Sequence, residues 1–358
     1  MARITLDKVT KTFAAHTALR DLSLDVADGE FFVLLGPTGA GKTTALRLIA
    51  GLDKPTSGRV LVDGEDMSDW TSAQRDIALV FQYYSLYPRY TVRQNLAFPL
   101  RSRVRNYSQA EIDTRIAAAA KTLRIEHLLE RKTDRLSGGE MQRVAIGRAI
   151  VREPRAFLMD EPLSNLDAKL REALRSELKD LQMKLKATFL FVTHDQIEAM
   201  SMGDKVGVLN NGQIVQVGTP QQIYNSPRDI FVASFVGSPA MNLVKGEVKA
   251  GALTTLSGQL VVPLPAAVAG KAHGTEAVTA GIRAEDVVVG PDGTAEARVH
   301  HIENHGVELI VTLRVEGHLF KVTTPATMKF AVEDGVRFSW TPDKVHVFGA
   351  DGVSLAYR

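Results

Sequence analysis

The sequence predicts an α/β domain built on a parallel sheet, followed by a separate all-β domain. Three observations support this architecture. Apolar runs before residue 235 have the length of buried strands, and helical segments follow them. One strand-to-helix turn is rich in glycine and ends in Lys42-Thr43. Beyond Gly237-Ser238-Pro239 the pattern changes to short β-like runs that are interrupted by Gly and Pro.

The glycine-rich turn matches the phosphate-binding pattern of Gly, four free positions and then Gly-Lys-Ser/Thr. It lies between the apolar run Phe31–Leu35 and the helical segment Thr44–Ala50, the context that the motif requires. Such a turn offers backbone amides to a polyphosphate, Lys42 can reach the terminal phosphates, and Thr43 can hold Mg²⁺. A plain glycine turn is the alternative, but a chance match is rare. The expected nucleotide-binding residues are Gly36, Pro37, Thr38, Gly39, Ala40, Gly41, Lys42, Thr43 and Thr44.

The first domain is expected to carry two further subdomains. Alternating apolar residues in segments 4–9 and 22–26 predict antiparallel strands at an edge sheet. The pattern from Val92 to Arg152 is helical, which predicts a helical subdomain at about residues 88–153. Asn211-Gly212 predicts a hairpin turn between two further strands. We place the domain boundary at 235/236, so the nucleotide-binding domain spans 1–235 and the all-β domain 236–358.

Two polar segments follow buried strands of the predicted parallel sheet. Asp160 and Glu161 come directly after the run 156–159, and His194 follows the run 189–192. Because the carboxyl ends of parallel strands lie at one edge, these side chains should gather near Lys42. We expect Asp160 to support Mg²⁺, Glu161 to polarise an attacking water and His194 to bond a phosphate or that water. The alternatives are a solvated acidic turn and a structural histidine.

Two other features have both a structural and a functional interpretation. Ser137-Gly138-Gly139 opens a long helix, where helix-terminal amides and a hydroxyl can form a second anion site. The alternative is a capping turn. Phe13 lies just ahead of the second strand. A flat ring near a nucleotide loop could stack on an adenine, although a lone aromatic residue is more often part of the core.

Composition narrows the function classes. The 43 Lys and Arg against 41 Asp and Glu give a net charge of +2, so no global field indicates nucleic acid as a partner. The absence of cysteine excludes disulfides and thiolate chemistry. No run approaches the roughly 18 apolar residues of a membrane span. We therefore expect a soluble cytoplasmic protein.

The motifs occur in the order found in ATPase subunits of ABC transporters, which the chain resembles. They are the phosphate loop, Gln82, Leu136–Glu140, Phe157–Pro162, Leu163–Asp167 and His194. This resemblance covers residues 1 to about 235. The segments Gly237–Asn242 and Gly281–Asp286 resemble the C-terminal OB-like (TOBE) regulatory domain of the maltose-transporter-like subgroup. Two departures from the family pattern are Glu140, which replaces the usual Gln, and Tyr83, which stands where a small residue is common.

The resemblance implies an Mg-ATP-dependent ATPase that works as a head-to-tail homodimer. Each nucleotide would lie between the phosphate loop of one subunit and the Ser137-Gly138-Gly139 loop of the other. The implied roles are adenine stacking for Phe13, a link between Mg²⁺ and the membrane partner for Gln82, γ-phosphate contacts in trans for Ser137 and Gly139, the dimer loop for Asp167, the catalytic base for Glu161 and the switch for His194.

The resemblance also implies partners. A membrane permease would bind near Gln82–Pro88, an extracytoplasmic solute-binding protein would join the complex, and the chain would be peripheral at the cytoplasmic face of the membrane. A sugar, polyol or glycerophosphate derivative is the expected solute, ahead of polyamine, iron or oxyanion. A DNA-repair ATPase would have a long coiled coil before Leu136, and a translation ATPase would have two cassettes. The chain has neither feature, and no nucleic-acid partner is expected.

Overall fold

The computed structural model describes residues 2–102, 106–249, 251–255, 258, 260–266, 268, 270, 278–315 and 317–357. Contacts divide the chain into two compact units, 1–221 and 222–358, and each is described by itself. The predicted fold class is confirmed, because the first unit is α/β and the second is dominated by antiparallel strands. The contacts divide the chain earlier than the predicted 235/236 boundary, which places α9 (Ile230–Phe235) in the second unit.

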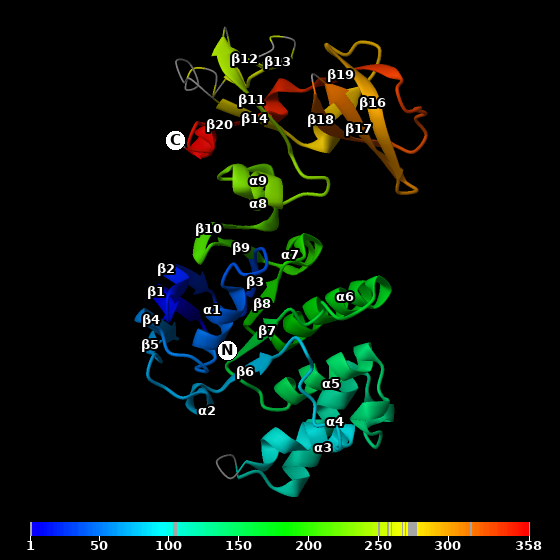
Figure 1. The fold of residues 1–358 in the computed structure, drawn as a ribbon. Helices are drawn as coiled ribbons and strands as arrows, with labels where there is room; N and C mark the ends of the chain where they lie inside the picture. Colours follow the sequence, from blue (N-terminus) through cyan, green and yellow to red (C-terminus); the bar gives the residue numbers. More distant parts are fainter. Residues whose placement is uncertain are drawn as a thin grey trace. The chain divides into compact units, whose positions relative to one another are not determined.

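A six-stranded sheet forms the centre of the first unit (Figure 1). Its strands, in spatial order, are β10 (Gln213–Gly218), β9 (Lys205–Asn210), β3 (Phe31–Leu35), β8 (Phe189–Thr193), β7 (Ala156–Asp160) and β6 (Ile77–Val80). All neighbours pair in parallel except β10, which forms the predicted hairpin with β9. The carboxyl ends of β3, β7 and β8 therefore lie side by side.

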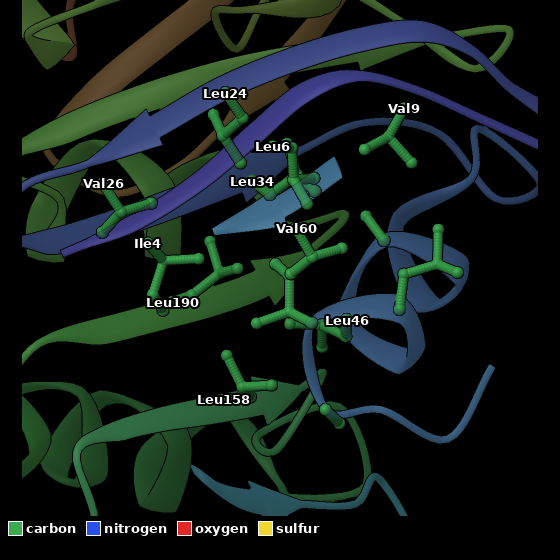
Figure 2. Packing of buried hydrophobic residues seen from close by; sticks show 14 of the residues in the cluster. Ile4, Leu6, Val9, Leu24, Val26, Leu34, Leu46, Val60, Leu158 and Leu190 are labelled. Carbon is green, nitrogen blue, oxygen red and sulfur yellow. The ribbon is translucent and has the colours of Figure 1, made fainter. Parts of the chain in front are cut away.

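A four-stranded antiparallel sheet packs its apolar residues against the parallel sheet. Its order is β2 (His16–Val26), β1 (Ile4–Phe13), β4 (Ser57–Val62) and β5 (Glu65–Asp66). The apolar residues Ile4, Leu6 and Val9 of β1 are buried, and an irregularity in the pairing with β2 interrupts the alternation between Leu6 and Val9. Figure 2 shows this core, where Ile4, Leu6 and Val60 face Leu34, Leu158 and Leu190 of the parallel sheet, with Leu46 of α1 (Lys42–Ile49) beside them. The core fixes α1, and hence the glycine-rich loop, against the sheet.

The remaining helices of the first unit include the predicted helical segment between β6 and β7. They are α2 (Ser72–Arg75), α3 (Val92–Ala97), η1 (Phe98–Arg101), α4 (Gln109–Leu123), η2 (Glu126–Leu128), η3 (Thr133–Arg135), α5 (Gly138–Ile150), α6 (Ala168–Leu185) and α7 (Gln196–Met202). Capping boxes at Thr91, Ser108 and Ser137 define three of the starts. Within the described ranges, no helix is both long and apolar enough to cross a bilayer.

The second unit contains two five-stranded antiparallel sheets, α9 and all but the first two residues of α8. One sheet has the order β13 (Val261–Pro263), β12 (Ala252–Thr254), β11 (Asn242–Lys249), β14 (Val278–Ile282) and β20 (His346–Phe348). The other has the order β15 (Val287–Val289), β19 (Gly335–Trp340), β16 (Ala295–Asn304), β17 (Glu308–Val315) and β18 (His318–Pro325). Both sheets contribute to one core, in which Val244, Val299, Phe320 and Phe338 are buried. The helix α8 spans Pro220–Asn225, and the last turn, η6, is Leu355–Tyr357.

Arg283 explains why these helices belong to the second unit. The residue is 2% exposed, its Cζ lies 4.0 Å from the centre of the Tyr224 ring, and its guanidinium donates to the Tyr224 carbonyl at 2.8 Å. The same side chain donates to the carbonyls of Ala233 and Val236 at the end of α9. Carbonyls at a helix end need such partners. Arg283 is therefore one of the residues that join α8 and α9 to the β-sheets, together with the packing of Ala233 against Met241 and Phe348.

His346 makes the stability of the second unit depend on pH. Burial, together with Arg283 and Lys344, lowers the pKa of His346 to about 4. The unfolded chain binds this proton at a pKa of about 6.5, so acid favours unfolding between these values. We expect the free energy of unfolding to fall by roughly 2–3 kcal/mol from this group between pH 7 and pH 4.5.

The measurement is urea unfolding of a Trp70→Phe chain, followed by the fluorescence of Trp340, which lies in the second unit. Carboxylates contribute their own pH dependence, so the His346→Gln chain is the control. The free energy of unfolding of the unsubstituted histidine chain, taken relative to that of the His346→Gln chain, should fall by this amount as the pH falls from 7 to 4.5. Parallel pH profiles for the two chains would show that His346 has no such effect.

Candidate active site

The glycine-rich loop joins β3 to α1 and requires glycine at specific positions. Gly41 has a φ of 108°, and a Cβ there would lie 2.7 Å from the Ala18 carbonyl oxygen. A Cβ on Gly36 would lie 2.3 Å from the Leu209 carbonyl oxygen. Gly41 caps α1 without a side-chain hydrogen bond, so the first-turn amides are available to an anion. The loop thus fits a polyphosphate.

Lys42 is buried at the centre of this loop. Only 5% of the residue is exposed, and its Nζ donates to the carbonyls of Gly36 at 2.8 Å and Pro37 at 3.0 Å. The same Nζ lies 3.4 Å from Oε1 of Glu161. The ammonium therefore lies between the loop and the acidic residues at the end of β7.

Thr43 and Asp160 provide oxygen ligands of the kind that Mg²⁺ prefers. The Thr43 hydroxyl donates to Asp160 Oδ1 at 3.1 Å. Burial raises the pKa of Asp160, and the neighbouring charge of Glu161 raises it further. A divalent cation beside this pair would offset that cost, because it favours the ionised carboxylate. The hydroxyl and carboxylate fit an Mg²⁺ site.

Glu161 forms the connection between Lys42 and His194. Its Oε2 lies 2.9 Å from Nδ1 of His194, while its Oε1 faces Lys42. Its side chain is 17% exposed and that of His194 is 52% exposed. The backbone of Glu161 is left-handed, with φ of 44°. A carboxylate held between two nitrogen groups at this edge has the position of a proton acceptor.

The structure brings together the predicted residues Lys42, Thr43, Asp160, Glu161 and His194. Gln82 is connected to them indirectly, because its Nε2 donates to Ser164 Oγ at 3.2 Å and Ser164 in turn donates to the Glu161 carbonyl. The assigned roles of these residues stay predictions.

The Ser137-Gly138-Gly139 turn lies at the start of α5. A Cβ on Gly138 would lie 3.3 Å from Leu166, and a Cβ on Gly139 would lie 2.6 Å from Leu170. The turn therefore packs against the segment that leads into α6. Glu140 completes its capping box, accepting from the Ser137 amide at 2.7 Å and from its hydroxyl at 2.9 Å. This bonding lowers the pKa of Glu140.

Phe13 and Asp167 occupy the ends of their elements. Phe13 closes β1, is 43% exposed and has Lys11 Nζ 4.7 Å from the centre of its ring. The simpler expectation, that Phe13 is a core residue, is therefore wrong. Asp167 caps α6 by accepting from the Leu170 amide at 3.0 Å.

Sequence reasoning missed three polar residues around the site. Ser164 lies inside the motif Leu163–Asp167, so its place in the sequence could have identified it. Arg148 donates to the carbonyls of Ser85 at 2.6 Å and Tyr84 at 3.3 Å, and Arg171 donates to the Leu166 carbonyl at 3.1 Å. Arg148 binds carbonyls that lie 63 and 64 residues away in the sequence, and Arg171 binds a carbonyl just before the start of its own helix. No spacing rule identifies such contacts.

Comparisons with known proteins agree with this geometry. Residues 19–164 match the family described as ABC transporter, 237–287 the MalK OB fold domain and 280–348 the TOBE domain. The sn-glycerol-3-phosphate import ATP-binding protein UgpC of Rhizobium meliloti is 47% identical over 99% of this chain and 100% of its own. The xylose/arabinose import ATP-binding protein XacK of Haloferax volcanii is 44% identical over 100% and 96%.

Solved structures are similar to the cassette part of the chain. The dimeric cassette MJ0796 in a post-hydrolysis state with ADP and Pi has a TM-score of 0.54 and 34% identity, covering 61% of this chain and 98% of that one. The cassette cbiO1 of Clostridium perfringens has a TM-score of 0.57 and 28% identity over 62% and 89%. The chain therefore belongs to the ABC transporter family and is an ATP-binding subunit, an ATPase whose cofactors are ATP and Mg²⁺.

Proposed function

We propose that the chain is the ATP-hydrolysing subunit of an importer for a sugar, polyol or glycerophosphate derivative. The observation that carries the ATPase site is the Glu161 carboxylate, which lies between Lys42 and His194 next to Asp160. The solute class follows from full-length relatives, whose names specify import of sn-glycerol-3-phosphate and of xylose and arabinose. These names favour this class over polyamine, iron or oxyanion.

Each site residue receives a role from its position. Lys42 and the loop amides would hold the phosphates, and Thr43, Asp160 and Gln82 would hold Mg²⁺. The metal ion supplies positive charge that offsets the charge of the phosphates. Glu161 takes a proton from the attacking water, and His194 holds the Glu161 carboxylate in place. Phe13 lies exposed at the end of β1, with Lys11 Nζ over its ring, and an adenine would stack on the ring at this exposed position.

A second copy of the chain would complete the site. Ser137 and Gly139 lie at the start of α5, packed on the segment that contains Leu166 and Asp167. A head-to-tail homodimer would place this turn, with its free helix-start amides, against the nucleotide of the partner. Asp167 would lie at the dimer contact. The second unit lacks these chemical residues, and we propose a regulatory and dimerising role for it.

A membrane permease is the proposed partner of the surface around Gln82–Pro88. Tyr83 is 75% exposed, and Phe81, the residue directly before this segment, lines a cavity of about 780 Å³. Its lining includes the partly or fully exposed apolar side chains Leu52, Leu79 and Phe81. Polar and charged residues, Asp76 and Arg152 among them, also line this hollow, and its size fits a helix or loop of a partner with both apolar and polar side chains. The chain would thus be peripheral at the cytoplasmic face of the membrane, and an extracytoplasmic solute-binding protein would complete the importer.

The role of Glu161 is tested by Glu161→Gln. We expect this change to preserve ATP binding and to lower turnover by roughly 10²-fold or more, because the amide cannot accept the proton. The variant should also accumulate as an ATP-bound dimer, measured by light scattering. Glu172→Gln, an exposed substitution of the same type, is the control. Turnover within a few-fold of wild type would remove Glu161 from this role, and a monomer at saturating Mg-ATP would contradict the dimer.

The role of Phe13 is tested by Phe13→Ala. We expect ATP binding to weaken by about 1–2 kcal/mol through loss of stacking. Thermal stability should change little, because the ring is 43% exposed. Phe98→Ala, which removes a ring that is 48% exposed, is the control for ATP affinity. Unchanged affinity in the Phe13 variant would exclude stacking.

The permease surface is tested by Leu52→Asp, which replaces an apolar side chain of the hollow by a charged one. The isolated chain should retain ATP hydrolysis, while its recovery with membranes from cells that express the whole importer should fall at least tenfold. Met183→Asp is the control, since Met183 is 55% exposed and lies outside the hollow. Equal recovery of both variants with membranes would place the permease contact elsewhere.

A further inference from the structure

We propose that Arg171 is a positioning residue that connects the loop Leu163–Asp167 to the segment around His194. Through this connection the dimer contact would control the histidine. The inference rests on the proposed function, because the loop and His194 receive their roles there. Neither the family motifs nor the spacing of the sequence points to Arg171.

Arg171 makes its two connections from the first turn of α6. Its Nη2 donates to the Leu166 carbonyl at 3.1 Å, and its Nη1 lies 3.4 Å from Oδ2 of Asp195. Leu166 and Asp195 belong to segments that follow β7 and β8, respectively. One guanidinium thus joins the two loops that leave neighbouring strands of the parallel sheet.

Asp195 fixes the backbone on the carboxyl side of His194. Its Oδ1 accepts from the amides of Ile197 at 2.7 Å and Glu198 at 3.3 Å, which caps α7. Its own amide donates to the Thr193 hydroxyl at 2.9 Å, and that hydroxyl donates to Glu198 at 2.6 Å. Both neighbours of His194 are therefore held by hydrogen bonds, and Arg171 binds one of them.

The other end of the connection begins at Glu161. The Glu161 carbonyl accepts from the Ser164 amide at 3.2 Å and from its hydroxyl at 2.9 Å. The loop then reaches Leu166, which is 6% exposed, and Asp167 at the start of α6. A displacement of this loop in a dimer would therefore move the Leu166 carbonyl, and Arg171 would transmit the movement to Asp195.

Two properties favour a functional connection over a purely structural bond. The Nε of Arg171 is buried and has no hydrogen-bond partner among the described residues. A buried donor without a partner is unfavourable, so a second arrangement of the side chain could gain a bond that this one lacks. The ion pair with Asp195 is long and its side chains are 31% and 23% exposed, so it adds little stability.

The experiment compares steady-state ATP hydrolysis of the full chain with that of Arg171→Met, Asp195→Asn and the double variant. We expect kcat to fall at least tenfold in each single variant, with KM for ATP and the melting temperature close to wild type. Asn preserves the cap of α7, so Asp195→Asn removes mainly the charge. Because both changes break one connection, the double variant should be no slower than the slower single variant.

Two further variants make the result specific. Arg171→Lys should restore part of kcat, because the ammonium can still pair with Asp195. Lys184→Met, an exposed substitution on the same helix, should leave kcat unchanged. A wild-type kcat in Arg171→Met, or losses of kcat that multiply in the double variant, would overturn this inference and leave the proposed function intact. A wild-type chain without ATP hydrolysis would overturn the proposed function and this inference with it.

Discussion

The parallel alignment of β3, β7 and β8 is the constraint on which the site depends. Leu35 of β3 pairs with Thr193 of β8, and Asp160 of β7 pairs with Val192 of β8. The residues that follow these positions therefore leave the sheet at one edge. Lys42 reaches Glu161 from one side and His194 reaches it from the other, although the three are far apart in sequence.

The same alignment creates an electrostatic imbalance that a ligand can correct. Two adjacent carboxylates share a buried edge, and burial raises the pKa of Asp160. Lys42 provides one positive charge, and Thr43 occupies one oxygen of Asp160 through its hydroxyl. A bound divalent cation would stabilise both carboxylates, while the loop amides and Lys42 suit the phosphates that accompany it. Cation and polyphosphate are thus complementary to different halves of one site.

The loop after β6 connects this edge to the helical segment. Tyr84 and Ser85 have φ values of 43° and 51°, which are unfavourable for residues with a Cβ. Arg148 of α5 donates to both of their carbonyls, and the Gln82 side chain bonds to Ser164. The segment that contains Gln82 is therefore held between α5 and the loop after β7. A partner that binds this segment would act on both.

The sequence by itself determined the elements and most residues of the site, because these depend on local rules. The glycine positions of the loop follow from backbone sterics, and the buried runs that precede Asp160 and Thr193 follow from strand periodicity. Only the tertiary structure decided which groups touch. Phe13 is exposed, α9 packs with the second unit through Arg283, and Arg171 bridges two loops. These contacts depend on where a long side chain meets a distant carbonyl or carboxylate, and packing in three dimensions sets that distance.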